Sequence, residues 1–327
     1  MSLRPFGYLL AFAILLAAPL GCGRGAPLDD DPIFEPEVAT TILGPADHRE
    51  KLAAEMPELS PGQPVKGGRR SQVTLTMPSG SRMTVWVYQP EPLPAAKVPC
   101  VFIAPGGTMM VHGQHLSQGD QQEHLPWVEA GFAVVAYELS GHADAQSASD
   151  IDLKFAAEEF RQAGSGLTNA KLAMTFAEKK IPFVDASRFY TAGHSSAGTI
   201  ALYVAQHDPR VKGTALFMPA IDIREELGIE GMTYIQDSGI VPNAGEYVAR
   251  VSPSTYVERV ARPTFLFYVA NDTTVRGDVI EVFGKKLREL GREVTVVRAP
   301  TGGHHQPMLD EGLPLAIQWA KLIEAMH

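Results

Sequence analysis

The chain has 327 residues, of which 45% are hydrophobic and 20% are charged, and its formal net charge at pH 7 is −9. This composition is ordinary for a globular protein and supplies ample apolar material for a core. The acidic balance disfavours a nucleic-acid partner, because binding to a phosphate backbone needs clustered lysine and arginine. Length alone suggests about two domains, but a single α/β domain often spans about 250 residues or more.

Residues 1–21 are expected to form a signal peptide. Arg4 precedes an apolar stretch from Phe6 to Leu20, which is short for a membrane span and suits the core of a secretory signal. The stretch ends in the letters PLGC, which resemble a bacterial lipobox, where a small residue precedes the lipidated cysteine. The resemblance implies an exported cell-envelope lipoprotein with a membrane tether through Cys22. A plain secretory signal cut nearby, which leaves a secreted protein, is the alternative.

Residues 22–66 are expected to be a tether that continues into a wrap over the folded domain, because they are rich in Pro, Asp and Glu and show weak periodicity. The folded domain is expected at residues 67–327. The second of the two cysteines, Cys100, lies in the apolar stretch VPCVFIAP and is expected to be a small buried hydrophobic residue. No disulfide framework and no cysteine metal site follow from this arrangement.

The folded part begins with two alternating β segments from Ser71, and the letters PSGS between them predict a hairpin. Apolar strands then alternate with helical stripes, which predicts a mostly parallel sheet with an N-terminal antiparallel hairpin and helices on both faces. Ligands in such sheets bind outside the carboxyl ends of the strands. We predict strands at 98–105, 131–139, 188–192, 211–220, 263–270 and 293–299. Helices are predicted at 152–180 (interrupted near 164–166), after the strand at 188–192 as far as His207, at 278–290 and at 314–326. The segment 222–258, before the strand at 263, is predicted to be an irregular insertion.

The stretch GHSSAG, from Gly193 to Gly198, joins a predicted strand to a helix. In a nucleophile elbow the serine at this junction has a strained backbone and an exposed hydroxyl, and small residues two before and two after it let strand and helix pack closely. Gly193 meets the first requirement and Ala197 stands at the second. Ser195 is the predicted nucleophile, and the N–H of Ser196 is the first predicted oxyanion donor. The alternative is a tight turn whose serine only caps the helix.

A nucleophilic serine needs a base, and the base needs an acid that fixes its tautomer. Asp272 follows the predicted strand TFLFYVA, and the letters GGHH follow the strand EVTVVRA, so acid and base stand in the chain order Ser, Asp, His of α/β-hydrolases. His304 and His305 compete as the base, and the two preceding glycines favour His304. Asp222, after the strand at 211–220, is the alternative acid, and helix capping is the alternative role of Asp272.

A second oxyanion donor is expected after the strand VPCVFIA, where the chain continues as Pro-Gly-Gly-Thr. Glycines let backbone N–H groups approach an oxyanion with no Cβ in the way. The N–H of Gly107 is the predicted donor, with that of Thr108 next. A simple turn is the alternative.

From about Ser71 to the C-terminus, the chain resembles α/β-hydrolases of the dienelactone-hydrolase and prolyl-oligopeptidase catalytic-domain type. The resemblance rests on VDASRFYTAGHSSAG, VANDTTV and PTGGHHQPM, which are similar to that type's stretches around nucleophile, acid and base. It implies a serine hydrolase that acts through an acyl-enzyme, with Ser195, Asp272 and His304 as its triad. Only about 50 residues precede the hairpin, too few for the β-propeller of prolyl oligopeptidases, so ester cleavage is expected ahead of peptide cleavage.

The expected substrate is a small-molecule or short-peptide acyl compound, and the mechanism requires no cofactor. His112, His115, His124 and His142 follow two predicted strands, but no cysteine or carboxylate cluster completes a ligand set, so no metal is expected. His194 is expected to pack or hydrogen-bond within the elbow. Three functions stay open: an exported serine esterase, a serine peptidase or amidase, and an inactive hydrolase fold that serves as a cell-envelope binding protein.

Overall fold

A computed structural model describes residues 56–108, 110–144 and 147–326. The predicted signal peptide, the predicted lipidation site Cys22 and most of the predicted tether at 22–66 lie outside the described residues. The described residues all belong to one compact unit of the chain. None of the helices in this part of the chain is long and apolar enough to cross a membrane.

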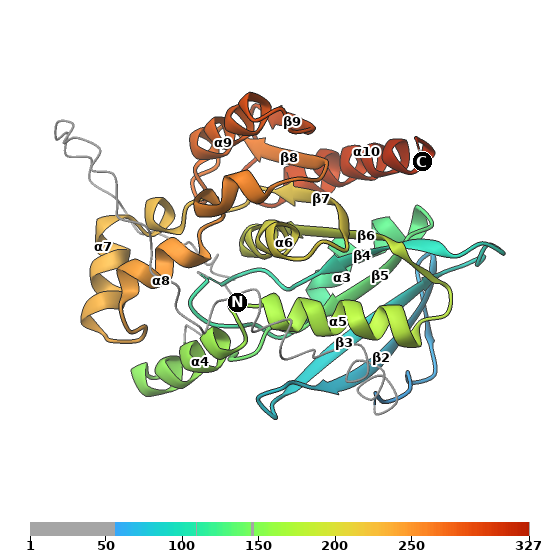
Figure 1. Cartoon of the computed structure of the whole chain (residues 1–327), viewed down its shortest axis with the longest axis horizontal. Coiled ribbons are helices and arrows are strands. Elements are labelled where there is room, and N and C mark those ends of the chain that lie inside the picture. The colour runs from blue at the N-terminus through green and yellow to red at the C-terminus, as the bar shows by residue number, and fades with distance from the viewer. Residues whose placement is uncertain (1–55, 109, 145–146, 327) are drawn as a thin grey trace, which may run out of the picture. The chain divides into compact units, whose positions relative to one another are not determined.

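The described residues form a nine-stranded sheet with the strand order β1-β2-β3-β5-β4-β6-β7-β8-β9 (Figure 1). The pairs from β1 through β3 to β5 are antiparallel, and all pairs from β5 through β4 to β9 are parallel. This confirms the mostly parallel sheet with its N-terminal antiparallel hairpin, which is the β2–β3 pair. The strands are β1 (Gln63–Val65), β2 (Gly68–Thr76), β3 (Arg82–Pro90), β4 (Val98–Ile103), β5 (Ala133–Tyr137), β6 (Val184–His194), β7 (Val211–Phe217), β8 (Thr264–Val269) and β9 (Val294–Ala299).

Helices cover both faces of the sheet, as the alternation of buried strand residues requires. Val85 and Val87 of β3 belong to an apolar core shared with α5, whereas Trp86 and Tyr88 belong to a second core shared with α3 and α10. The helices are α3 (Gln121–Glu129), α4 (Asp150–Gln162), α5 (Leu167–Lys180), α6 (Ser196–His207), α7 (Ile223–Asp237), α8 (Ala244–Val251), α9 (Gly277–Glu289) and α10 (Leu313–Ala325), with the short turns η1 (Gln118–Asp120), η2 (Pro253–Arg259) and η3 (Met308–Gly312).

The segment between β7 and β8 is helical, so the prediction of an irregular insertion at 222–258 was wrong. It forms α7, α8 and η2 (Figure 1). The buried residues of α7 and α8 join the same core as α5, whereas Val257 of η2 joins the core of α3 and α10. The helical stripe of α7 is weak because most of the helix faces solvent, with Ile229 and Tyr234 exposed. Gly228, at φ 60°, also breaks the helix in its middle. Both features hide the helical period from a reading of the sequence.

The described end of the predicted wrap lies along the outer hairpin strand. The N–H of Ser60 donates to the carbonyl of Gln72 at 2.9 Å, and the N–H of Gln72 donates to the Ser60 hydroxyl at 2.8 Å. β1 then extends the hairpin as a third antiparallel strand. These contacts cover the edge of β2, which would otherwise present unpaired backbone groups.

Candidate active site

The predicted catalytic residues follow the carboxyl ends of strands in the parallel part of the sheet. Ser195 directly follows β6, Gly107 comes after β4, Asp272 after β8 and His304 after β9. The strand order reverses at β4, which lies between β5 and β6, and a crevice opens at such a point in α/β sheets. The topology therefore brings these four segments to one edge of the sheet.

Ser195 stands at the junction of β6 and α6 with φ 57° and ψ −129°, a conformation that side-chain-bearing residues rarely adopt. Its backbone N–H donates to the carbonyl of Phe217 at the end of β7, at 2.9 Å, which ties the junction to the neighbouring strand. Ser195 is the residue at the cap position of α6, yet its side chain makes no capping hydrogen bond. The hydroxyl is therefore not used to cap the helix, and Ser195 is only partly buried.

Close packing between β6 and α6 makes glycine necessary before the serine. A Cβ on Gly193 would stand 2.4 Å from the carbonyl carbon of Ala197, and a Cβ on Gly198 would stand 2.8 Å from the carbonyl oxygen of Gly193. Ala197 itself is accommodated, with only 1% of its surface exposed. The close approach thus excludes a side chain at Gly193 and Gly198 but leaves room for the alanine methyl.

His304 and Asp272 form a hydrogen-bonded pair. The Nδ1–H of His304 donates to Oδ2 of Asp272 at 2.7 Å, while Oδ1 of Asp272 accepts from the N–H groups of Thr274 at 2.8 Å and Val275 at 3.3 Å. Burial by itself raises the pKa of Asp272, but the hydrogen bonds from His304 and Thr274 outweigh it and hold the pKa below its usual value. Asp272 is therefore ionised near neutral pH.

The other ring nitrogen of His304 is available for chemistry. Nε2 of His304 is buried and has no hydrogen-bond partner among the described residues. The ring lies beside the elbow: its centroid is 4.6 Å from that of His194, and Nε2 of His194 lies 2.7 Å from the His304 carbonyl oxygen, to which its N–H donates. A buried acceptor nitrogen next to the residue that precedes Ser195 suits a general base.

The alternative acid and the alternative base have other partners. Oδ1 of Asp222 accepts from the N–H groups of Arg224 and Glu225 at the start of α7, and Oδ2 accepts from the Ser254 hydroxyl at 2.8 Å. Asp222 therefore caps a helix. Nε2 of His305 lies 3.8 Å from Oε1 of Glu123, so its ring faces α3 while His304 faces Asp272.

Two backbone N–H groups are free to receive an oxyanion. The N–H of Ser196 belongs to the first residue of α6, where helix geometry leaves it without an intrahelical acceptor. Gly107 has φ +91°, and no hydrogen bond of its N–H is found within the described part of the chain. The N–H of Thr108 is different, because it donates to the Ser196 hydroxyl at 3.0 Å. That bond fixes the loop after β4 against the elbow.

The same loop is also held by the insertion. The Tyr247 hydroxyl of α8 donates to the Met110 carbonyl at 2.6 Å, and it lies 3.0 Å from the Ser165 hydroxyl. Four residues after Asp272, the Arg276 guanidinium donates to the Glu225 carboxylate of α7 at 2.8 Å. The helices between β7 and β8 therefore contact both the loop after β4 and the loop that follows Asp272.

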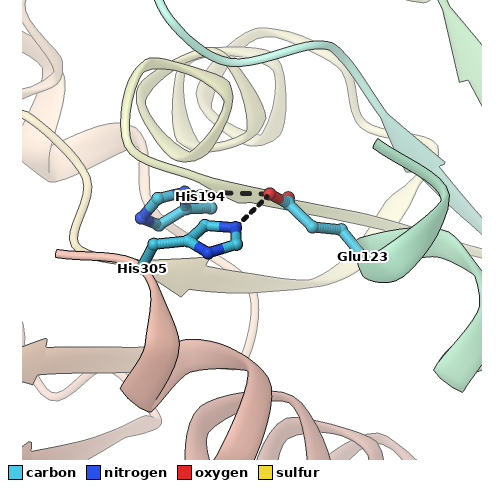
Figure 2. Close-up of side chains that lie close together, drawn as sticks. All are labelled: Glu123, His194 and His305. Carbon is cyan, nitrogen blue, oxygen red and sulfur yellow. Dashed lines mark ion pairs between the residues drawn. The ribbon is translucent and has the colours of Figure 1, made fainter. Parts of the chain in front are cut away.

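A cluster of Glu123, His194 and His305 lies next to these residues, and sequence reasoning missed Glu123. Figure 2 shows both histidine rings directed at the Glu123 carboxylate, with Nδ1 of His194 at 3.7 Å and Nε2 of His305 at 3.8 Å from the same oxygen. Burial lowers the pKa of His194 to about 4, so this ring is neutral near pH 7. The nearby Glu123 carboxylate raises the pKa of His305.

The four histidines that first suggest a metal site are engaged in other contacts. Nδ1–H of His112 donates to the Gly113 carbonyl at 2.8 Å, and His124 is buried with Nδ1 at 3.1 Å from the Tyr88 hydroxyl. His115 and His142 have ring centroids 3.4 Å apart. His115 also contacts the Glu138 carboxylate at 2.8 Å.

No protein-family model matches the chain, and no curated protein matches it by sequence. Solved structures do match. An acetyl xylan esterase from Paenibacillus sp. R4 superposes with a TM-score of 0.62 at 17% identity, over 90% of this chain and 96% of that one. A putative dienelactone hydrolase from Klebsiella pneumoniae gives a TM-score of 0.57 at 16% identity, over 77% and 98%. The Pyrococcus horikoshii acylaminoacyl peptidase gives 0.57 at 16% identity, over 84% of this chain and 42% of that one, so the chain matches less than half of that peptidase.

These similarities and the observed sheet agree on the architecture. The hairpin, the reversal of strand order at β4 and the sharp turn between β6 and α6 are all present in this chain. At identities of 16–17%, the structural neighbours establish the fold alone. The chain has the α/β-hydrolase fold.

Proposed function

We propose that the protein is a serine hydrolase that cleaves carboxylic esters, with Ser195 as nucleophile, His304 as base and Asp272 as acid. The main support is that Ser195 has the strained backbone of an elbow and an uncapped hydroxyl, and that a histidine hydrogen-bonded to a buried carboxylate packs against the preceding residue, His194. A structural turn has no need of either feature, and strained backbone conformations of this kind cluster at active sites.

In the proposed reaction, Nε2 of His304 accepts the hydroxyl proton of Ser195 as Oγ bonds to the acyl carbon. Asp272 holds the Nδ1–H and stabilises the imidazolium. The N–H groups of Ser196 and Gly107 donate to the oxygen that becomes negative. His304 then gives its proton to the leaving alcohol as the carbon–oxygen bond breaks, and water hydrolyses the acyl-enzyme by the same steps in reverse order.

The proposed substrates are esters with a short acyl group. Two neighbours that are matched over nearly their whole length carry names that denote an acetyl ester and a lactone as substrates. The peptidase neighbour is matched over less than half of its length, so it supports peptide cleavage less directly. A peptidase or amidase activity is the competing outcome of the substrate screen.

The decisive experiment is covalent labelling with a fluorophosphonate probe, which reacts with activated serines. The wild type is compared with Ser195→Ala, and Ser79→Ala in the β2–β3 turn serves as the control because Ser79 is exposed and remote from the site. We expect labelling of the wild type and of the control, and none of Ser195→Ala. Turnover of p-nitrophenyl acetate should fall by ~10⁴-fold or more in Ser195→Ala.

Other results would redirect the proposal. Labelling that persists in Ser195→Ala would mean that another serine is the nucleophile, with Ser196 the next to test. A folded wild type that does not react would favour a binding protein with a hydrolase fold. Cleavage of acyl-peptide anilides without cleavage of short esters would make the protein a peptidase.

We also propose that the protein is exported and tethered to the membrane through lipidated Cys22. The support is the apolar stretch from Phe6 to Leu20 followed by the letters PLGC. Mass spectrometry of the mature N-terminus tests this. A diacylglyceryl-modified Cys22, and release from the membrane fraction by Cys22→Ala, are expected. An unmodified, soluble product cut at another position would refute lipidation at Cys22 and support export only.

A further inference from the structure

Three side chains from distant parts of the sequence converge beside the elbow. Glu123 comes from α3, His194 from the last position of β6, and His305 from the loop after β9 (Figure 2). The ligand atoms that they offer, one from each residue, lie within 4.8 Å of one another. None of the three has a part in the proposed ester cleavage.

The hydrogen bonds of the two rings turn a lone pair from each towards the carboxylate. Nε2 of His194 is 2.7 Å from the His304 carbonyl, which only accepts, so the proton is on Nε2 and the lone pair is on Nδ1. Nε2 of His305 lies 3.3 Å from the Gln122 amide nitrogen, which only donates, so this nitrogen also carries a lone pair in the neutral ring. Two nitrogen lone pairs therefore face one carboxylate oxygen.

With both rings neutral, this arrangement lacks a positive charge, which either a proton on His305 or a bound cation would supply. The gaps of 3.7 Å and 3.8 Å between Oε1 of Glu123 and the two nitrogens are too long for hydrogen bonds. Acceptors that face one another repel unless a proton or a metal cation stands between them. A single proton bridges only one of the two gaps, whereas a cation at the centre would bond to all three atoms.

The spacing suits a first-row divalent cation. A point equidistant from three atoms spaced 3.7, 3.8 and at most 4.8 Å apart lies no more than about 2.4 Å from each, against about 2.0–2.2 Å for the bonds of zinc to histidine nitrogen and carboxylate oxygen. Movements of a few tenths of an ångström close this difference. Two imidazoles and one carboxylate form a ligand set that zinc uses with water in the fourth position.

We propose that Glu123, His194 and His305 form a binding site for a divalent transition-metal ion of the zinc type. The donation from His194 to the His304 carbonyl is the second hydrogen bond that usually orients a metal-ligating histidine. A metal ion can enter from the side of His305, because that side chain is 41% exposed. The His194 side chain, which is only 10% exposed, forms the inner part of the site. The exposed Gln122 amide turns aside when the metal takes the His305 lone pair.

The metal would hold the base loop in place. It links α3 to the residue before the nucleophile and to the residue after the proposed base, and His194 already holds the His304 backbone. The site is thus positioned to stabilise His304 without contacting the reacting atoms. Metal binding at these three residues does not depend on the proposed ester cleavage.

The test measures zinc binding directly, without an activity readout. Full-length protein is stripped with a chelator, dialysed and titrated with Zn²⁺ by isothermal titration calorimetry, with metal content checked by elemental analysis. We expect one zinc per chain in the wild type. His305→Gln and Glu123→Gln should each weaken zinc binding at least as much as the ~100-fold that loss of an outer partner alone can cost. His115→Gln, which changes another exposed histidine beside a carboxylate, should bind zinc like the wild type.

Two further measurements check that the variants are folded and that the metal is bound by the proposed ligands. Circular dichroism of each metal-free variant checks that it is folded, and His305→Gln is the safer change because the side chain is partly exposed. Co²⁺ added to the stripped wild type should give the visible absorption bands of a four-coordinate site, and these bands should be absent in His305→Gln. Zinc that fails to bind, or that binds equally to wild type and both ligand variants, overturns the proposal and leaves Glu123 as an ion-pair partner of His305.

Discussion

Replacing Gly193 with alanine should distort the elbow without removing any proposed catalytic group. The new Cβ would stand 2.4 Å from the carbonyl carbon of Ala197, 2.5 Å from its oxygen and 2.7 Å from the nitrogen of Gly198. All three atoms are backbone, so no side chain can turn aside. Because carbon atoms prefer separations of about 3.5 Å or more, the first turn of α6 must move by about 1 Å.

The size of the effect follows from that movement. Forcing a group into a packed interior costs about 1–3 kcal/mol, so we expect a loss of about 2–3 kcal/mol in the free energy of unfolding. A displacement of about 1 Å between reacting groups can lower the rate by about 100-fold. The rate of fluorophosphonate labelling of Ser195 should therefore fall by about that factor in Gly193→Ala.

Urea unfolding followed by circular dichroism measures the first effect, and the time course of probe labelling measures the second. The matched control is Gly245→Ala, in the first turn of α8, where the new Cβ would meet only the end of the Arg224 side chain, at 3.5 Å. That change should leave stability within about 0.5 kcal/mol or improve it slightly, because alanine favours helix. A Gly193→Ala variant with the stability and labelling rate of the wild type would refute the close approach of β6 and α6.

Three further predictions concern individual contacts. Asp272→Asn should lower kcat on short esters by ~10⁴-fold, because the amide favours the wrong tautomer of the base, and steady-state kinetics on p-nitrophenyl acetate checks this. His207 packs between Tyr203 and Tyr256, and burial, with a smaller effect of nearby cations, lowers its pKa to about 4, so between pH 6.5 and 4.5 only the unfolded chain takes up this proton. His207 should therefore contribute a loss of about 2 kcal/mol in the free energy of unfolding as the pH drops through this range, and His207→Gln should reduce the pH dependence by that amount, with the contribution of buried His194 remaining, in urea titrations at both pH values. Ser196→Ala leaves a buried backbone N–H without its acceptor and should cost about 1–3 kcal/mol by the same unfolding assay.

Much of the architecture follows from local sequence patterns. Continuous apolar runs predicted β4 through β9, and the break at Gly164–Gly166 correctly separated α4 from α5. The period of apolar residues and the chemistry of turns are set by residues a few positions apart, so a linear reading detects them. α3 was not predicted from the sequence because Pro126 lies inside this helix, and proline normally ends a helix.

The sequence determined which residues could form the candidate site, and the tertiary structure decided how they pair. Asp272 and Asp222 both follow strands, and His304 and His305 are neighbours, so chain position did not separate them; the observed geometry pairs His304 with Asp272 and turns His305 towards Glu123. The cluster of Glu123, His194 and His305 could not be predicted from the sequence, because its members come from three segments far apart in the chain. Which side chains converge depends on strand order, register and helix orientation, and these are set by packing across the whole sheet.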